Sequence, residues 1–547
     1  MLFRAVVFLF IVFIAQAAKA DKYYIYFADK AGQTLDPYEY FNTKAIERRV
    51  KCRVPLVQKS DLPVNPNYIS RIEELSDSLS VVSRWLNMVC VYANHNGIEE
   101  IRKLPFVDLV EKAKSRCLLL SNSDSINALG DDEKLSLAYQ LNSLGYQEYK
   151  ARNYTGSGVT IAVFDAGFTK ANEHVGLAHL NVLSSYDFVQ KDNNPFHGST
   201  HGTSVLGNIG GRYNEQPIGM AQNANYLLAR TERHFLEMAS EEENWLAAAE
   251  WADKNGADII SSSLGYTNTR YFREDMNGTS LVAKAAMLAF SKGIIVVNSA
   301  GNEGDNEWKY IGTPADADSV LAVGGVSPKT GLRIDFSSYG PNAKGQLKPN
   351  VTACAKTFTC SPSGYEIAYG TSFSAPLVAG FIACAIEAKP NLNHKQLFEL
   401  IQQSSHLYPY SDYSHGYGIP QAKAIFGQMD SIKYEYKIES FGKNSFHIIP
   451  KDSSKVNKDS FCTYFKEVRI HTKIETISGK TLYYSAANPW FDWRENINSW
   501  PRANIYTSIQ HVEPDKKYVI TVFAKGFQAK KEFTWQSNDY YFSSPSE

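Results

Sequence analysis

Apolar runs alternate with helix-like segments from Val159 onward. The runs VTIAVFD (159–165), NYLLAR (225–230), DIISSSL (258–264) and IIVVNSA (294–300) are typical of buried strands. Helices are predicted over about 241–253, stopped by Gly256, and over 280–292, stopped by Gly293. Strands that are apolar throughout and separated by helices indicate a parallel sheet covered on both faces. The pattern therefore predicts an α/β fold with a doubly wound, mostly parallel sheet, in a domain spanning residues 135–427.

Different patterns flank this domain. Residues 21–112 contain the strand-like YYIYFA, RWLNMVCVYA and FVDLV and the helix-like NPNYISRIEELSDS and GIEEIRKL, which predict a small α+β domain. The polar stretch within residues 113–134 is typical of a linker and a processing zone. After Gly427 the helical signal ends, while KYEYKIESF alternates and YVITVF is β-branched and aromatic. Residues 428–547 are therefore predicted to form a separate C-terminal β domain.

The first twenty residues differ from the rest of the chain. Arg4 is followed by the apolar run AVVFLFIVFI (5–14) and by Ala18-Lys19-Ala20, a small-residue A-x-A pattern. This order is typical of a cleaved secretory signal peptide over residues 1–20. The alternative is an uncleaved membrane anchor, but the apolar run is shorter than the roughly 20 residues that cross a bilayer. We expect a secreted or periplasmic protein with no membrane span after removal of the signal.

Length and composition are those of a soluble, multidomain globular protein. The chain has 547 residues, of which 44% are hydrophobic and 21% charged, and its formal net charge is -1. This length exceeds one ordinary core, so two or three domains are expected. Because there is no basic excess, the composition gives no support to a nucleic-acid-binding function.

Seven cysteines leave at least one thiol unpaired in an oxidising compartment. Cys354 and Cys360 are close enough in sequence to close a loop by a disulfide, and the sequence leaves open whether they do. Cys384 lies in the apolar run LVAGFIACAI, where a small buried hydrophobic side chain is the better interpretation. No pair has C-x-x-C spacing, so neither a zinc site nor a redox dithiol is supported.

Four polar residues are of the types that peptide hydrolysis requires: a nucleophile, a base, an acid that orients the base and a donor for the oxyanion. In GTSFSAP (370–376), Ser372 stands at the start of a long apolar helix, where backbone N–H groups and the helix dipole favour negative charge. Asp165 and Asn302 follow strands of the sheet, and sites in such sheets form at the carboxyl ends of strands. Taken singly, Ser372 could be a helix cap, His201 a structural histidine, Asn302 a turn residue and Asp165 a strand end.

The joint order of these residues resembles the subtilase family, the subtilisin-like serine proteases. GTSFSAP resembles the nucleophile motif, HGTS (201–204) the histidine motif, NSAGNEG (298–304) the oxyanion segment, and FDAG (164–167) the aspartate motif. The resemblance implies an Asp165, His201, Ser372 triad with Asn302 in the oxyanion hole. It covers residues 135–427 well and the N-terminal domain more loosely. Ala166 departs from the Ser or Thr of many members, but it keeps a small side chain beside an intact acid.

The same resemblance implies the substrate-binding residues. These are Ser263, Leu264 and Gly265 at the edge that pairs with substrate, Ala300 and Gly301 on the opposite wall, and Gly312 at the base of the pocket. With apolar walls and no evident carboxylate, the pocket is expected to prefer large apolar or aromatic P1 residues. The alternative is broad cleavage governed by backbone pairing alone.

The resemblance also implies how the protein is made and what it needs. Residues 21–112 would be an inhibitory, folding-assisting prodomain that acts on its own chain; the alternative is a permanent adhesive or dimerising domain. Substrates would be proteins or peptides, no cofactor or catalytic metal is required, and a structural calcium ion is compatible with the family but has no assignable ligands.

The sequence gives less support to two other functions. A catalytically inactive subtilase fold that only binds would lack a triad or oxyanion residue, and none is missing here. An esterase of the α/β-hydrolase type would show G-x-S-x-G at the nucleophile, which GTSFSAP does not match.

Overall fold

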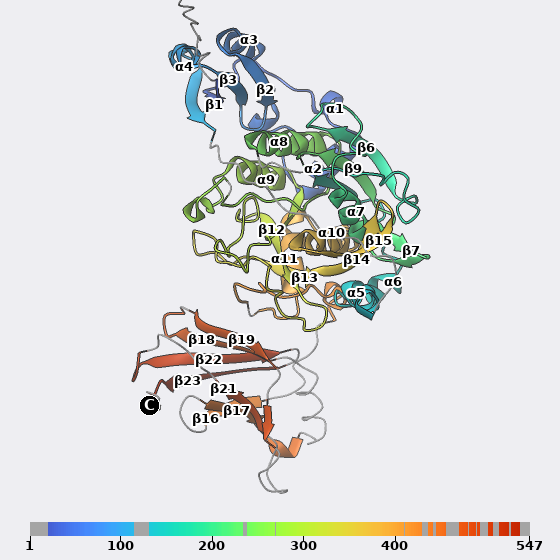
Figure 1. Cartoon of the computed structure of the whole chain (residues 1–547), viewed down its shortest axis with the longest axis vertical. Helices are drawn as coiled ribbons and strands as arrows, with labels where there is room; N and C mark the ends of the chain where they lie inside the picture. The colour runs from blue at the N-terminus through green and yellow to red at the C-terminus, as the bar shows by residue number, and fades with distance from the viewer. Residues whose placement is uncertain are drawn as a thin grey trace, which may run out of the picture.

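The chain forms three parts that follow one another in sequence and are drawn from blue to red in Figure 1. The computed structural model describes residues 20–113, 131–233, 238–268, 270–409, 411–428, 436–440, 445–455, 470–479, 481–487, 490–492, 502–506, 513–524 and 527–536. The predicted signal peptide, except its last residue, and most of the predicted linker lie outside these residues. So do Cys117 and Cys462.

The N-terminal domain is built on an antiparallel sheet. Its strands are β1 (Asp21–Phe27), β2 (Ser78–Ser83), β3 (Met88–Ala93) and β4 (Val107–Lys112), in the order β2-β3-β1-β4. Helices α3 (Pro66–Leu75) and α4 (His95–Ile101) cover one face, where Ile25, Val91 and Ile101 are fully buried. The opposite face carries Tyr24 and Met88, which pack against the central domain. The α+β character predicted from the sequence is confirmed.

Part of this domain has no counterpart in the sequence prediction. Between β1 and α3 the chain forms α1 (Pro37–Tyr40), α2 (Thr43–Cys52) and the short 3-10 helix η1 (Lys59–Asp61). Helix α2 is rich in Lys and Arg, yet it buries Arg48 and Arg49. Because two of its four buried positions are arginines, the buried face of α2 cannot be recognised from the sequence as an apolar stripe.

The central domain is a seven-stranded sheet in which every neighbouring pair is parallel. Its order is β13-β12-β11-β10-β5-β9-β6. The strands are β5 (Thr160–Asp165), β6 (Asn181–Asp187), β9 (Asn225–Arg230), β10 (Ile259–Ser262), β11 (Ile295–Ser299), β12 (Val320–Val326) and β13 (Val351–Cys354). The four strands expected from the apolar runs are among them, and the predicted α/β fold is confirmed.

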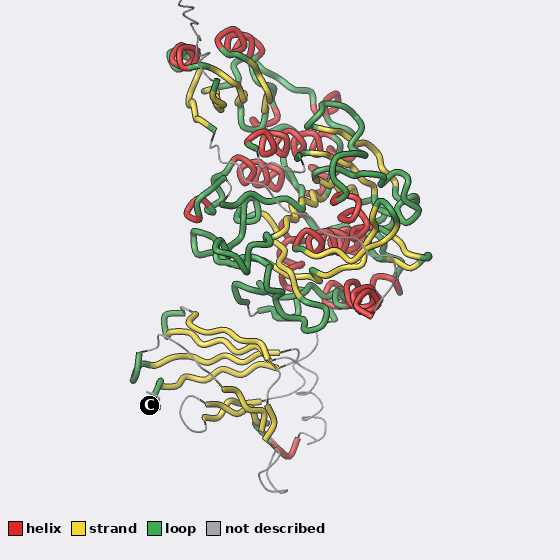
Figure 2. The backbone as a smooth tube through the Cα atoms, viewed as in Figure 1, coloured by secondary structure: helices red, strands yellow, loops and turns green. Residues whose placement is uncertain are grey.

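Helices cover both faces of this sheet (Figure 2). Ile161 and Val163 of β5 point to the face of α7 (His201–Gly210) and α10 (Thr371–Ala388), whereas Ala162 and Phe164 point to α8 (Ala239–Lys254) and α9 (Leu281–Ser291). This strict alternation leaves no wet face, which is why the strands read as continuous apolar runs.

Smaller elements complete the central domain. They are α5 (Asp131–Asn142), α6 (Tyr146–Lys150), η2 (Arg273–Asp275), α11 (His394–Gln403), α12 (Ala422–Ile425) and the hairpins β7 (Arg212–Tyr213) with β8 (Gln216–Pro217) and β14 (Lys356–Ser361) with β15 (Gly364–Tyr369). Helix α5 begins inside the predicted linker 113–134. Its Gln140 is buried and bonds the backbone of Phe358 and Ile218, so this helix belongs to the central domain.

The C-terminal part contains two antiparallel four-stranded sheets, as the alternating pattern predicts. One has the order β16-β17-β21-β20 and the other β19-β18-β22-β23. The strands are β16 (Tyr436–Ser440), β17 (Ser445–Pro450), β18 (Ile470–Thr476), β19 (Thr481–Ala487), β20 (Trp490–Asp492), β21 (Arg502–Tyr506), β22 (Lys517–Ala524) and β23 (Phe527–Thr534). Among the described residues after Gly427, the one helical turn is η3 (Ser453–Lys455).

The disulfide considered between Cys354 and Cys360 is not formed. Both are free, buried thiols. Cys354 ends β13 and its sulfur lies 3.1 Å from the carbonyl oxygen of Lys356, while Cys360 lies in the β14–β15 hairpin opposite Tyr365. The two side chains serve as small apolar groups in the core. Cys384 is fully buried in α10, as predicted.

One described helix, Thr371–Ala388, is long and apolar enough to cross a membrane. It is 89% buried inside the molecule. It is therefore the core helix α10, packed against the sheet.

Candidate active site

The predicted motifs meet at one edge of the central sheet. Strand β5 ends at Asp165, and β10 and β11 end just before the segments 263–265 and 300–302. Because these strands are parallel, their carboxyl ends lie at the same edge. Helices α7 and α10 begin at this edge with His201 and Thr371.

Asp165 and His201 form a hydrogen-bonded pair. The Nδ1 atom of His201 lies 3.0 and 2.9 Å from the two carboxylate oxygens of Asp165. Asp165 is fully buried and also accepts a hydrogen bond from the Ala166 N–H at 2.8 Å. Burial alone would lower the pKa of His201, but the charge and the hydrogen bond of Asp165 outweigh it and raise this pKa above its usual value. The pair is thus arranged to stabilise an imidazolium.

Ser372 lies in the first turn of α10. Its hydroxyl donates to the carbonyl oxygen of Ser263 at 3.3 Å, and the Ser263 hydroxyl donates to the carbonyl oxygen of Ser372 at 2.7 Å. The next residue, Phe373, packs against the His201 ring with centroids 5.3 Å apart. The predicted nucleophile segment therefore lies beside both the imidazole and the 263–265 segment.

Asn302 is exposed, and its side chain has a fixed orientation. Its Oδ1 atom accepts a hydrogen bond from the Thr371 N–H at 2.8 Å. Since the oxygen is engaged, the amide Nδ2 group is left to donate into the space before α10. Gly370 has φ +145°, and a Cβ there would lie 3.3 Å from Nδ2. Glycine at this position thus gives the strained turn and keeps the amide accessible.

The three segments predicted to line the substrate pocket are joined through their backbones. Tyr266 and Thr313 exchange hydrogen bonds of 2.9 and 3.1 Å, and the Gly312 N–H donates to the Ala300 carbonyl at 3.3 Å. Ser263, Leu264, Gly265, Ala300, Gly301 and Gly312 are therefore brought together as expected. A single backbone framework connects the edge segment, the opposite wall and the base.

Two details of the pocket differ from the sequence expectation. A Cβ on Gly312 would lie 2.8 Å from Cγ2 of Thr267, so this glycine is needed for packing behind the base. A carboxylate, that of Glu303, lies behind the Gly301 wall and accepts a hydrogen bond from Ser338 at 2.9 Å. Burial raises the pKa of Glu303.

Sequence reasoning missed the residues that position the predicted ones. Thr371, which fixes Asn302, and Phe373, which contacts His201, both lie inside GTSFSAP, so the motif contained them without indicating their roles. The buried hydroxyl of Ser199 accepts a hydrogen bond from the His201 N–H at 3.1 Å. No pattern in the sequence marks Ser199.

Two clusters among the described residues have the donor types of a metal site, and neither fits a structural calcium ion. In the cluster of Asp187, Asp192 and His197, Asp187 is already neutralised by Arg230 at 2.8 Å. The other cluster consists of Asp412, His415 and His471. There the Nδ1 atom of His415 faces Asp412, and its Nε2 atom accepts a hydrogen bond from a backbone N–H at 2.9 Å. Calcium favours oxygen ligands, and these groups are mostly committed to protein partners.

Comparison with known proteins decides the family. Residues 156–418 match the model of the Subtilase family, and residues 22–127 match the Peptidase S8 propeptide domain, Bacteroidota. Subtilisin of Bacillus pumilus is 30% identical over 293 residues, which are 53% of this chain and 98% of that protein. The chain belongs to the subtilase family. It is a subtilisin-like serine protease with a propeptide domain of the S8 type.

Other subtilases match over similar lengths. Subtilisin NAT of Bacillus subtilis subsp. natto is 26% identical over 358 residues, covering 64% of this chain and 84% of that protein. A solved protease structure from Pseudoalteromonas arctica PAMC 21717 is 24% identical, with a TM-score of 0.42, and covers 52% of this chain and 93% of its own.

Proposed function

We propose that this subtilase is an active, secreted serine endopeptidase made as a zymogen, with Asp165, His201 and Ser372 as its triad. The observation that carries the proposal is the hydrogen-bonded Asp165–His201 pair at the sheet edge where Ser372 lies in the first turn of α10. None of the three roles is replaced by an inert residue, so the inactive-binder alternative has no supporting observation.

The geometry supports a two-step acyl transfer. Neutral His201 takes the proton of Ser372 as the hydroxyl attacks the substrate carbonyl, and Asp165 stabilises the resulting imidazolium. The Nδ2 group of Asn302 and the Ser372 N–H would hold the oxyanion of the tetrahedral intermediate. His201 then returns the proton to the leaving amine, and water releases the acyl group by the same route. No step requires a metal or an organic cofactor.

The propeptide domain supports the zymogen part of the proposal. The β1–β4 sheet packs against α8 and α9, the two helices on the face opposite α10. From β4 the chain continues into the polar linker, so cleavage in the part of the linker that precedes α5 would separate inhibitor from enzyme. The apolar start of the chain supports export, to a periplasm or out of the cell.

A fluorophosphonate probe tests the proposal, because it reacts only with an activated serine. After removal of the propeptide, the wild type should be labelled and Ser372→Ala should not. Ser374→Ala is a matched control, because Ser374 lies in the same motif but its buried hydroxyl bonds the Cys354 carbonyl at 3.1 Å. A wild-type chain that stays unlabelled, or a Ser372→Ala chain that is labelled, would contradict the assignment.

A further inference from the structure

The propeptide domain contacts the enzyme at both ends of helix α8. Near the start of the helix, Lys22 of β1 pairs with Glu243 at 2.8 Å and the Ser80 hydroxyl bonds the same carboxylate at 3.0 Å. This first contact lies on the side of the active-site edge. Helix α8 has 16 residues and is therefore about 24 Å long, so its far end is well separated from that edge.

The second contact is made by α2 at the C-terminal ends of α8 and α9 (Figure 1). Side chains before and within α2 donate to backbone carbonyls there. Nδ2 of Asn42 bonds the Asn255 oxygen at 2.6 Å, and Nη1 of Arg48 bonds the Ala257 oxygen at 2.6 Å. The last carbonyls of a helix have no partner within it and carry partial negative charge, so cationic donors from another segment are well suited to them.

Buried charges of opposite sign meet at the same place. Asp253 of α8 accepts hydrogen bonds from Arg48 and Arg49, the latter at 2.6 Å. Lys292, just after α9, donates to Asp61 of the propeptide at 2.7 Å. The side chains of all five residues are at most 2% exposed. Each domain thus contributes both signs of charge. Arg49 and Asp61 also pair with each other within the propeptide, at 2.9 Å, whereas Asp253 and Lys292 form their ion pairs with propeptide residues.

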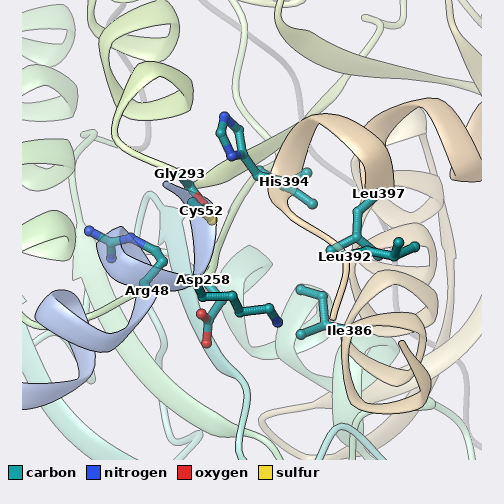
Figure 3. A pocket seen from close by; sticks show the side chains of 10 residues that line it. Arg48, Cys52, Asp258, Gly293, Ile386, Leu392, His394 and Leu397 are labelled. Carbon is teal, nitrogen blue, oxygen red and sulfur yellow. Dashed lines mark hydrogen bonds between the residues drawn. The ribbon is translucent and has the colours of Figure 1, made fainter. Parts of the chain in front are cut away.

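The two surfaces also fit closely in their apolar parts. Figure 3 shows Arg48 and Cys52 of α2 on one side of a small pocket, with His394 and Leu397 of α11 on the other. The sulfur of Cys52 lies 3.7 Å from the Gly293 carbonyl oxygen, and a Cβ on Gly293 would lie 3.0 Å from that sulfur. A side chain at position 293 would therefore press on Cys52 while α2 is bound.

We propose that Asp253, Lys292 and the carbonyls of Asn255 and Ala257 form a second docking site for the propeptide, outside the active-site cleft. The inference rests on the proposed role of residues 21–112 as an inhibitor. This second docking site adds to the contacts near the active-site edge, and it sets how fast the cut propeptide leaves the enzyme.

The test follows the propeptide and needs no peptidase activity. The full chain is prepared as Ser372→Ala, and trypsin is used to cut the polar linker, which contains Lys114 and Arg116. The propeptide should then co-elute with the enzyme part on gel filtration. In the same background, Arg49→Met removes the cation that pairs with both Asp253 and Asp61. The rate at which the propeptide dissociates should then rise by about 100-fold or more.

A milder variant keeps the propeptide fold intact. Asn42 caps α2 by accepting from the Ala45 N–H at 2.9 Å, and Asn42→Asp preserves this cap while replacing the donor to the Asn255 carbonyl by an acceptor. About tenfold faster dissociation is expected from loss of this hydrogen bond. Arg71→Met is the control, because Arg71 and Glu74 are exposed on the propeptide and about half or more of each side chain contacts water.

The outcomes separate the two hypotheses. Unchanged dissociation in Asn42→Asp and in Arg49→Met, or immediate loss of the propeptide from the parent chain, would overturn the second docking site. These results would leave the peptidase assignment untouched, because that assignment depends on fluorophosphonate labelling of the chain with Ser372 intact.

Discussion

Asn302 is the residue whose orientation depends most directly on its neighbours. Thr371 holds its Oδ1 atom, and the Nδ2 group is free to donate to an oxyanion. Asn302→Ala should lower kcat by roughly 100- to 1000-fold and leave KM nearly unchanged, because the donor acts mainly in the transition state; this magnitude is that of the corresponding subtilisin variant.

Asn302→Asp is the matched control for this prediction. It keeps an oxygen for the Thr371 N–H but has no donor, so its loss of kcat should be at least as large. Steady-state kinetics on one peptide would decide, and a change below threefold in both variants would remove Asn302 from the oxyanion hole.

The substrate pocket allows a second prediction at this scale. Leu264 and Ala300, which we propose as its two walls, are buried apolar side chains, and each buried methylene contributes about 0.8 kcal/mol. Peptides with Phe or Leu at P1 should therefore exceed those with Ala by one to two orders of magnitude in kcat/KM. A peptide library would measure this, and a clear preference for Arg or Lys would contradict it.

Glu303 provides the control for charge at the pocket. Its carboxylate lies behind the Gly301 wall. If Lys at P1 is accepted at all, Glu303→Gln should reduce that cleavage and leave cleavage after Phe unchanged. Gly312 is a poor position for such a test, since any Cβ there would press on Thr267.

At the scale of elements, helix α11 places a histidine against the propeptide helix α2. Neither ring nitrogen of His394 has a hydrogen-bond partner in the described structure. Burial, and after it the charges of Lys395 and Arg48, lower the pKa of His394 to about 4. The histidine is therefore neutral in the complex above that pH, and release of α2 would return its pKa toward 6.5.

Dissociation of the propeptide should consequently take up a proton at His394 between pH 6.5 and 4. Within this window, each unit of lower pH weakens the complex by up to about tenfold through this group. His394→Asn should remove this contribution, and the difference in dissociation constant between wild type and variant over pH 4–7 measures it. A difference that does not change with pH would show that His394 stays neutral in both states.

The comparison with the variant is needed because other groups titrate at the same interface. Burial raises the pKa of Asp258, Glu243 and Glu250. When the propeptide dissociates and exposes them, these carboxyl groups would lose protons, which opposes the proton uptake at His394. Arg48 and Lys51 also line the pocket that His394 faces.

For the whole molecule, maturation is the prediction that joins its parts. Amino-terminal sequencing should find residue 21 at the start of the exported precursor and a new terminus between residues 113 and 131 in the mature enzyme. Helix α5 begins at Asp131 and packs on the central domain, so a cut further along would damage the enzyme. A mature form that still begins at residue 21 would favour a permanent N-terminal domain.

The domain boundaries and the triad stay predictions until such experiments are done. In the structure, each motif lies at the end of a strand or at the start of a helix. Short apolar runs predicted strands of the central sheet. Asp165 at the end of one strand and Asn302 shortly after another lie at the same edge of the sheet because these strands are parallel.

The sequence by itself determined four buried strands of the seven-stranded central sheet, the two helices that end before Gly256 and Gly293, the β character of the C-terminal part and the candidate catalytic residues. Each of these depends on a local pattern or on the order of motifs. Only the tertiary structure decided the free state of Cys354 and Cys360, the role of Thr371 and the burial of α2. The reason is physical. Arg49 of α2 pairs with Asp253, and Asp61 of η1 pairs with Lys292, each partner lying more than 200 residues away. No local pattern indicates a charge that is paired across domains.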